Sequence, residues 1–450
     1  MRIIREQKRK KSAVITAMAA LAVLAVALLL PACSQRSAGP GELPDILLVT
    51  IDTLRADHSS AYGYGVPTMP VLERLARRGT LFERVYAPTA TTSPSHAALL
   101  TGRYPRTLGV TKNGQRLPDN FTTLAEALGR EGYQTAAFVS SIPLRARFGF
   151  DQGFEHYDDQ FTVAGRSLGR PEGGRLDRRA DHTTQAVAKW MAGRHDPRPL
   201  FVWVHYVDPH APYQAPVAFA ARWPDTASPR VQAYDGEVRF ADSNLGRLVY
   251  VFERAAPKAG TLVVVTSDHG EGLGQHGWMY HGINLYEEAV RVPLVFSWPG
   301  KVAEGSRRTA TAELTDVATT IFGLLGLNTP SPFDGRDLMS AYQPRPVYLE
   351  RRRYRSSEVY GVPVAGPMHA VIDGDRKFIV APDEGRRELY DLAADPHETR
   401  DLAAGTDPGR AETLAGMIAA WTRANPEARP TREVAADGLR RRLEALGYVD

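Results

Sequence analysis

Acidic and histidine side chains follow three apolar segments of this chain, and such side chains can bind a metal ion. They are Asp52, Asp208 with His210, and Asp268 with His269. A continuous apolar run that ends in an acid is typical of a buried parallel strand, and the carboxyl ends of such strands share the sheet edge where ligands bind. Asp52, Asp268 and His269 therefore predict a divalent-metal site. Carboxylate ligands suit Ca²⁺, Mg²⁺ or Mn²⁺, and the histidine also admits Zn²⁺.

A second chemical feature is the cluster of hydroxyl side chains in segment 89–105, directly before an apolar helical pattern. The first N–H groups of a helix are free and favour anions. A hydroxyl at that position, close to a metal ion, can ionise and act as a nucleophile. The alternative is an ordinary Ser or Thr helix cap.

Histidines are concentrated in one part of the chain. Five of the twelve fall between His205 and His281. Of these, His269, His276 and His281 lie in a short glycine-rich loop, where packing alone does not call for them. We expect at least two of them to be functional.

The elements that must position these residues alternate between strands and helices. We expect strands over 45–52, 133–140, 200–208, 261–269 and 292–298, and helices over 69–78, 123–132, 235–254 and 315–325. This alternation predicts a doubly wound α/β domain with a mostly parallel sheet. Beyond 344 the segments 377–380 and 388–392 predict short strands, and 433–446 predicts an Arg-rich helix, so we expect a smaller C-terminal α+β domain. The Pro-rich stretch 330–346 marks the boundary, giving domains of 44–343 and 344–450.

The amino terminus has the pattern of an export signal. Basic residues fill the first eleven positions, and the uncharged segment 12–30 follows. The sequence around Cys33 resembles a bacterial lipobox, in which this cysteine is lipidated, and 34–43 reads as a tether. A plain transmembrane anchor is the alternative. Both place the body outside the cytoplasmic membrane, in the periplasm or at the cell surface.

Composition excludes several classes of protein. The 450 residues are 43% hydrophobic and include one cysteine, which excludes a disulfide scaffold and a cysteine metal site. The net charge is +4, but the first 33 residues alone have a net charge of +5, so the remainder has a net charge of −1. A near-neutral body gives no electrostatic basis for binding nucleic acid.

Taken together, the motifs resemble the sulfatase branch of the alkaline phosphatase superfamily. The segments that carry the resemblance are 52–57, 94–105, 208–213, 267–271, 281–294 and 388–396. They occur in the family's order, from about residue 44 to the end. The resemblance implies an alkaline-phosphatase-like fold and an ester hydrolase.

The resemblance also implies roles for individual residues. One divalent metal ion would be bound by Asp52, Thr92, Asp268 and His269. Substrate would be contacted by Asn113, His210 and His281. The implied catalytic set is Thr92, His96, His210 and His281. A second metal on Asp208, His210 and His276 matches the two-metal pattern of the superfamily's phosphodiesterases poorly, and we expect one metal.

One departure from the family pattern concerns the nucleophile. Sulfatases use a formylglycine made from Cys or Ser, whereas Thr92 stands at that position, and threonine cannot be oxidised to formylglycine. His96 replaces the arginine of the maturation motif. Direct threonine resembles the phosphodiesterase branch, so we expect phosphate or phosphonate esters to be preferred over sulfate esters. Thr91 and Ser93 are lesser candidates for the nucleophile.

Two other functions remain open at this point. A phospho-head-group transferase would use the same site with an alcohol in place of water, and a catalytically inactive, glycan-binding lipoprotein would hold the metal without turnover. The substrate, whether a small molecule or a glycan or lipid ester, would contact the loops 161–179 and 222–230.

Overall fold

The computed structural model describes residues 43–160, 177–220, 228–255, 259–330, 333–340, 345–403 and 407–432. The chain divides into units 1–40 and 41–450, and all the described residues lie in the second. The predicted signal and lipobox, most of the tether, the helix over 433–446 and most of the loops 161–179 and 222–230 are therefore outside the described residues. Among the described residues, no helix is long and apolar enough to cross a membrane.

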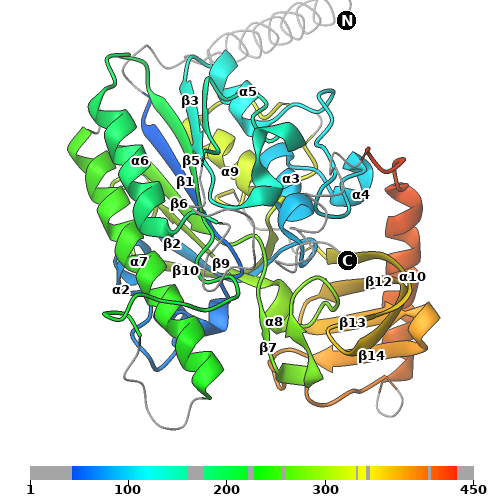
Figure 1. Cartoon of the computed structure of the whole chain (residues 1–450). Helices are drawn as coiled ribbons and strands as arrows, with labels where there is room; N and C mark the ends of the chain where they lie inside the picture. Colours follow the sequence, from blue (N-terminus) through cyan, green and yellow to red (C-terminus); the bar gives the residue numbers. More distant parts are fainter. Residues whose placement is uncertain are drawn as a thin grey trace, which may run out of the picture. The chain divides into compact units, whose positions relative to one another are not determined.

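A sheet of eight strands forms the centre of the larger part (Figure 1). Its order is β10-β2-β9-β6-β1-β5-β3-β4, and only β9 runs against its neighbours. This confirms the predicted mostly parallel sheet. The strands are β1 (Asp45–Ile51), β2 (Thr80–Tyr86), β3 (Gln134–Phe138), β4 (His156–Asp158), β5 (Leu200–Tyr206), β6 (Thr261–Thr266), β9 (Arg291–Ser297) and β10 (Ser306–Glu313).

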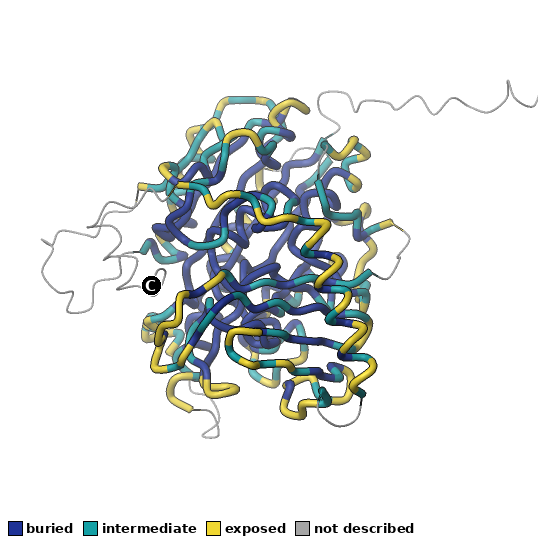
Figure 2. The backbone as a smooth tube through the Cα atoms, turned by 90° about the vertical axis from the view of Figure 1, so that its right-hand side faces the viewer, coloured by how far each residue is buried: buried dark blue, intermediate teal, exposed yellow. Residues whose placement is uncertain are grey.

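Helices cover both faces of this sheet. Alternate residues of β1 enter two separate cores: Ile46 and Leu48 pack on the side of α3, α5 and α9, and Leu47 and Val49 pack on the side of α2, α6 and α7. Figure 2 shows that the buried segments are gathered in the centre of the molecule. The helices are α2 (Pro70–Arg77), α3 (Thr92–Thr101), α4 (Pro105–Leu108), α5 (Leu124–Arg130), α6 (Ala180–Ala192), α7 (Pro229–Ala255), α8 (Glu287–Val290) and α9 (Asp316–Leu325).

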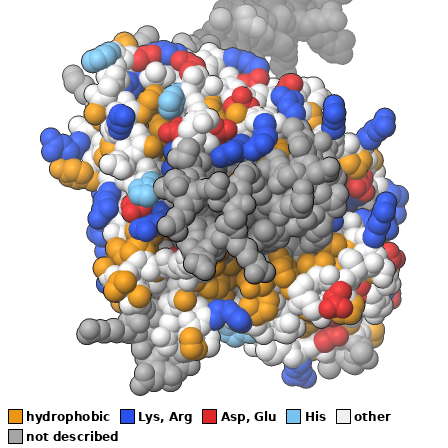
Figure 3. All heavy atoms as spheres, viewed as in Figure 1, with side chains coloured by type: hydrophobic (Ala, Val, Ile, Leu, Met, Phe, Trp, Pro, Cys, Tyr) orange, Lys and Arg blue, Asp and Glu red, His pale blue; other side chains and the backbone are white. Residues whose placement is uncertain are grey.

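A second, antiparallel sheet follows in the order β11-β12-β13-β14. One of its faces packs against α10 through residues such as Phe378 and Leu414, and the other packs against the loop after β8 through Leu349 and Ile283. The elements are β7 (Gly272–Leu273), β8 (Met279–Tyr280), β11 (Val347–Val359), β12 (Val362–Asp373), β13 (Arg376–Ala381), β14 (Arg386–Asp391) and α10 (Pro408–Ala424). The surface drawn in Figure 3 shows basic and acidic side chains interspersed.

Three neighbouring strands of the central sheet position the predicted chemistry. β5 and β6 pair with β1 on its two sides, both parallel to it, so their carboxyl ends lie at one edge. Asp52, Asp208 and Asp268 each follow one of these ends. α3 begins at the same edge, because its first residue, Thr92, contacts His269.

Candidate active site

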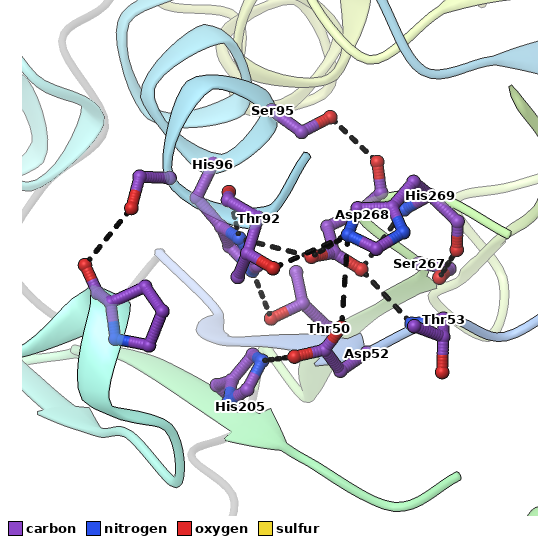
Figure 4. A network of polar contacts seen from close by, with 12 residues as sticks. Thr50, Asp52, Thr53, Thr92, Ser95, His96, His205, Ser267, Asp268 and His269 are labelled. Carbon is purple, nitrogen blue, oxygen red and sulfur yellow. Dashed lines mark hydrogen bonds and ion pairs between the residues drawn. The ribbon is translucent and has the colours of Figure 1, made fainter. Parts of the chain in front are cut away.

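Two carboxylates and one imidazole form a compact buried cluster at this edge (Figure 4). Ligand atoms of Asp52, Asp268 and His269 all lie within 4.8 Å of one another, and the three residues are completely buried. No other group of three or more His, Cys, Asp or Glu residues in the described part of the chain is close enough to hold a metal ion. The three residues predicted to bind metal are thus brought together.

The unpaired oxygens of this cluster fit a bound cation. Both carboxylate oxygens of Asp52 and Oδ2 of Asp268 have no hydrogen-bond partner among the described residues. His269 Nδ1 is 2.9 Å from the Gly270 carbonyl oxygen, which only accepts, so Nδ1 carries the proton. Burial lowers the pKa of His269 to about 3, so the ring is neutral and its Nε2 presents a lone pair. That lone pair lies 3.4 Å from Asp268 Oδ2, where a cation would relieve the repulsion.

The pKa values of the two carboxyl groups also favour a bound cation. Burial and the neighbouring Asp268 hold the pKa of Asp52 well above its ordinary value. Burial also raises the pKa of Asp268, although its Oδ1 accepts hydrogen bonds from the backbone N–H groups of Thr53 and His269. Ionising both carboxylates without a cation is therefore unfavourable.

The hydroxyl of Thr92 faces the cluster from the first residue of α3. Its Oγ1 lies 3.3 Å from His269 Nε2, and Thr92 is fully buried. The neighbouring Ser93 hydroxyl points elsewhere, because it donates to the Pro143 carbonyl at 3.1 Å. Thr91, the other lesser candidate, is the residue before the helix. Of the predicted nucleophiles, Thr92 is therefore the one that the geometry favours (Figure 4).

Asn113 reaches the same helix end from the loop after α4. Its Oδ1 accepts a hydrogen bond from the Ser93 backbone N–H at 2.7 Å. The side chain is almost fully buried. Asn113, the predicted substrate contact, is thus hydrogen-bonded to the residue that follows Thr92, at the first turn of α3.

His210 and His281 lie together next to His269. Their Nε2 atoms are 3.1 Å apart, and the ring centroids of His269 and His281 are 4.4 Å apart. His210 Nδ1 faces the Ala211 carbonyl at 2.7 Å and so carries its proton, which leaves Nε2 as the acceptor in the neutral ring. Burial lowers the pKa of His281 well below its ordinary value, so its ring is neutral.

His96 occupies a different place from the other predicted catalytic residues. Its Nδ1 lies 2.9 Å from the Thr92 carbonyl oxygen and 3.5 Å from Asp268 Oδ2, so Nδ1 donates. Its Nε2 lies 3.0 Å from the Thr50 hydroxyl, which also accepts a hydrogen bond from Trp203 Nε1. Both ring nitrogens are occupied by the protein, so the geometry makes His96 a support behind the cluster.

His205 is a residue that sequence reasoning missed. It lies on β5, opposite Thr50 of β1, and its Nε2 is 3.5 Å from Asp52 Oδ2. Its ring centroid lies 5.1 Å from that of His96, so one imidazole stands behind each carboxylate of the cluster. The signal in the sequence that could have identified His205 is a single histidine inside an otherwise apolar strand.

The predicted alternative set for a second metal is not brought together. Asp208 Oδ2 accepts from the Ala180 backbone N–H at 2.8 Å, at the start of α6. His276 stacks on Tyr286 with centroids 3.8 Å apart, and its Nδ1 lies 2.8 Å from Glu288 Oε1. An acid that follows a strand can either bind a metal ion or accept a hydrogen bond from the first N–H groups of a helix. The sequence alone does not distinguish these two roles for Asp208.

An α/β sheet whose strand ends hold such a cluster, with a hydroxyl at a helix start facing it, agrees with the class that the sequence motifs resemble, the ester hydrolases of the alkaline phosphatase superfamily. The family described as "Sulfatase" matches residues 44–327, and "N-sulphoglucosamine sulphohydrolase, C-terminal" matches residues 274–417. The chain therefore belongs to the sulfatase family.

Individual relatives agree with this assignment. The chain is 22% identical to an N-acetylglucosamine-6-O-sulfatase of Bacteroides thetaiotaomicron, over 84% of this chain and 85% of the relative. It is 24% identical to a choline-sulfatase of Rhizobium meliloti, over 80% and 82%. The phosphonate monoester hydrolase of Agrobacterium radiobacter superposes with a TM-score of 0.69 at 21% identity, covering 85% of this chain and 96% of that one. Sulfate-ester and phosphonate-ester hydrolases thus both resemble this chain.

Proposed function

We propose that this protein is a metal-dependent hydrolase that uses Thr92 as a direct nucleophile and prefers phosphate or phosphonate esters to sulfate esters. The observation that carries the proposal is the position of Thr92 Oγ1, 3.3 Å from His269 Nε2. Asp52, Asp268, His269 and Thr92 would hold one divalent ion, with Ca²⁺, Mn²⁺, Mg²⁺ and Zn²⁺ all compatible with the donor set. When bound, the ion favours the ionised hydroxyl and offsets negative charge on the ester.

The protein's own residues then orient the reaction. Thr92 Oγ1 attacks phosphorus and forms the Oγ1–P bond while the bond to the leaving oxygen breaks. The side-chain amide of Asn113, whose oxygen accepts from the Ser93 N–H, would present its NH2 group to a non-bridging oxygen, where an N–H donor stabilises negative charge. His210 and His281 would lie beside an oxygen of the ester, where a ring N–H that now faces the other histidine would be redirected to that oxygen. Water then attacks the phosphothreonine, and the Thr92 hydroxyl is restored.

The residue type at the nucleophile supports the preference for phosphorus. Formylglycine hydrates carry two hydroxyls on one carbon, so a sulfated formylglycine is discharged by elimination. Thr92 has one hydroxyl and cannot follow that route. The chain's single cysteine, Cys33, is far from the site in sequence, so no formylglycine precursor of that type is available.

We infer that His96 and His205 position the cluster and do not touch substrate. His96 donates toward the Thr92 carbonyl and Asp268, and the Thr50 hydroxyl completes its hydrogen bonding. His205 faces Asp52 from the other side. Imidazoles behind carboxylate ligands fix the direction in which the free oxygens point, and such support affects metal affinity.

The test compares an aryl phosphonate, an aryl phosphodiester and an aryl sulfate, each with several divalent metals. Thr92→Val keeps the shape of the side chain and replaces the hydroxyl with a methyl group. We expect kcat on phosphorus esters to fall by at least about 10³-fold, as for other nucleophile deletions, with an unchanged melting temperature. Thr101→Val, at the other end of α3, is the control, because its hydroxyl donates to the Ala97 carbonyl, away from the cluster.

Each other result has a definite meaning. Faster turnover of the sulfate that depends on Thr92 would contradict the preference for phosphorus. Full activity in Thr92→Val would refute the nucleophile. A phosphothreonine that is released only by an added alcohol would identify a transferase, and metal binding without turnover of any ester would identify a binding protein.

We also propose that the enzyme acts outside the cytoplasmic membrane, tethered through a lipid on Cys33. The support is the sequence pattern of the first 33 residues. In a bacterial host, Cys33→Ser should release the protein from the membrane fraction without changing its specific activity. Retention of Cys33→Ser in the membrane would favour an uncleaved transmembrane anchor instead.

A further inference from the structure

A small polar cavity lies between the start of α3, the short helix α4 and strand β11. Its volume is about 200 Å³. The residues that carry the argument are Thr89, Pro94, Arg106, Glu350, Arg352 and Arg353. None of them belongs to the cluster of Asp52, Asp268 and His269, so the cavity is distinct from the ester site.

The lining of this cavity has more positive than negative charge. Arg106, Arg352 and Arg353 line it together with Arg351, and two glutamates oppose these four arginines. Arg351 is already committed, because it donates to Glu384 at 2.7 Å and to three backbone carbonyls. Arg353 is largely exposed, and its contact with Asp383 is long at 3.6 Å. The cavity therefore attracts anions.

Arg106 is the buried member of the group, and its donors are incompletely used. The residue is 8% exposed, yet its Nε and Nη1 have no hydrogen-bond acceptor among the described residues. Glu350 Oε2 lies 3.5 Å from Nη1, an ion pair that is too long and indirect to satisfy both donors. Buried guanidinium donors normally have partners, and an oxyanion in the cavity would supply them.

The cavity adjoins the ester site through two shared segments. Thr89 and Pro94 line it on either side of Thr92 in the sequence. On the other wall, the Arg352 guanidinium stacks 3.7 Å above the ring of Tyr354, whose hydroxyl donates to the Gly282 carbonyl at 3.2 Å. Gly282 directly follows His281. Both walls of the cavity are thus connected, through short stretches of chain, to residues of the ester site.

We propose that this arginine-lined cavity is a second anion subsite, which binds a sulfate, phosphate or carboxylate group carried elsewhere on the substrate. The proposal rests on the proposed ester hydrolase and names its substrate class: esters of molecules with at least two anionic groups. The guanidinium fork of arginine matches such oxyanions, and the small volume suits one group and excludes a macromolecule.

The kinetic test uses two aryl phosphonates that differ only in a second anionic group, a carboxylate, at fixed ionic strength. Arg352→Gln should raise KM for the dianionic substrate at least about tenfold, with kcat within about twofold and the monoanionic substrate unaffected. Arg355→Gln is the matched control, because Arg355 lies on the same strand, is exposed and does not line the cavity. Equal changes in KM for both substrates, or equal effects of Arg352→Gln and Arg355→Gln, would overturn the proposal.

A binding test separates this proposal from the ester chemistry. In Thr92→Val with chelator present, no metal ion holds an anion at the cluster, and the cavity variant then shows by calorimetric titration whether inorganic sulfate binds in the cavity. We expect one site, lost in the double variant Arg106→Gln with Glu350→Gln, which removes both partners of the buried pair. If the enzyme proves inactive on every ester, this titration still decides the subsite, and absence of sulfate binding at millimolar concentration refutes it.

Discussion

Asp268→Asn isolates the role of one carboxylate oxygen in the cluster. Asp268 Oδ1 accepts from the backbone N–H groups of Thr53 at 3.2 Å and His269 at 2.9 Å, and an asparagine Oδ1 keeps both bonds. The substitution therefore changes only Oδ2, which accepts no hydrogen bond among the described residues and lies 3.5 Å from His96 Nδ1 and 3.4 Å from His269 Nε2. We expect the substitution to make the folded protein more stable than the wild type without metal and less stable with metal.

Without metal, we expect the variant to be more stable than the wild type at pH 8. Burial raises the pKa of Asp52 and Asp268, so the folded protein binds more protons than the unfolded chain. Stability is then lost as pH rises from about 4 through the raised pKa values. The asparagine side chain carries no charge and does not repel Asp52, so the variant loses less stability over this window.

With metal, the order reverses. A ligand at 100 times its Kd stabilises the folded state by about 2.7 kcal/mol. For a protein of this size, with an unfolding entropy of roughly 2 cal/mol/K per residue, this corresponds to a melting-temperature increase on the order of 3 °C. The wild type should show this increase, more strongly at pH 8 than at pH 5, because protons compete with the ion. The variant should show little of it.

The matched control is Asp45→Asn, at the opposite end of the strand that leads to Asp52. Burial raises the pKa of Asp45 to about 6, and its Oδ1 accepts one backbone hydrogen bond, from Leu200. This variant should also flatten the pH dependence but keep the full metal effect. The melting temperature of each variant is measured by thermal unfolding at pH 5 and pH 8, with chelator and with excess Mn²⁺, Ca²⁺ or Zn²⁺. The same metal response in Asp268→Asn and Asp45→Asn would refute the metal site.

Two further predictions concern the surroundings of the site. Lys377 Nζ lies 3.0 Å from Glu287 Oε1 and 2.8 Å from Glu398 Oε1 in a buried triad, so Lys377→Met should lower the free energy of unfolding by roughly 3–5 kcal/mol in urea denaturation, and a loss below about 1 kcal/mol would contradict this role. A Cβ on Gly270 would clash with the backbone carbonyl oxygen of Glu288 in α8, so Gly270→Ala should displace the adjacent metal ligand and weaken metal binding at least about tenfold by calorimetry, whereas Gly65→Ala, with open space around it, should bind metal like the wild type.

The sequence predicted the strands that carry the site because those strands are apolar almost throughout. β1, β5 and β6 are buried along their whole length, so their pattern is unambiguous. β10 was missed because its first five residues are mostly polar and partly exposed, as expected for an edge strand. The predicted domain boundary near 343 stays a prediction.

Contacts between distant segments explain what the sequence left out of the site. His205 lies in a strand whose pattern shows burial but not the neighbour that it faces. The contribution of β11 depends on the docking of the second sheet, which places Tyr354 against Gly282, 72 residues away. Residue types at strand ends could be read from the sequence, whereas which of them meet, and which serve as caps, is decided by packing.

Two departures from the family pattern, Thr92 and His96, are linked in the structure. They lie one turn apart on α3, and the His96 Nδ1–H faces the carbonyl of Thr92. The other ring nitrogen accepts from Thr50, whose oxygen accepts from Trp203, so every polar group in this chain of hydrogen bonds has a partner. A site that had only lost its formylglycine machinery would have no reason to hold the replacement residues in a completed network. The network instead fixes the backbone of Thr92 and the direction of Asp268 at the same time, as the proposed threonine nucleophile would require.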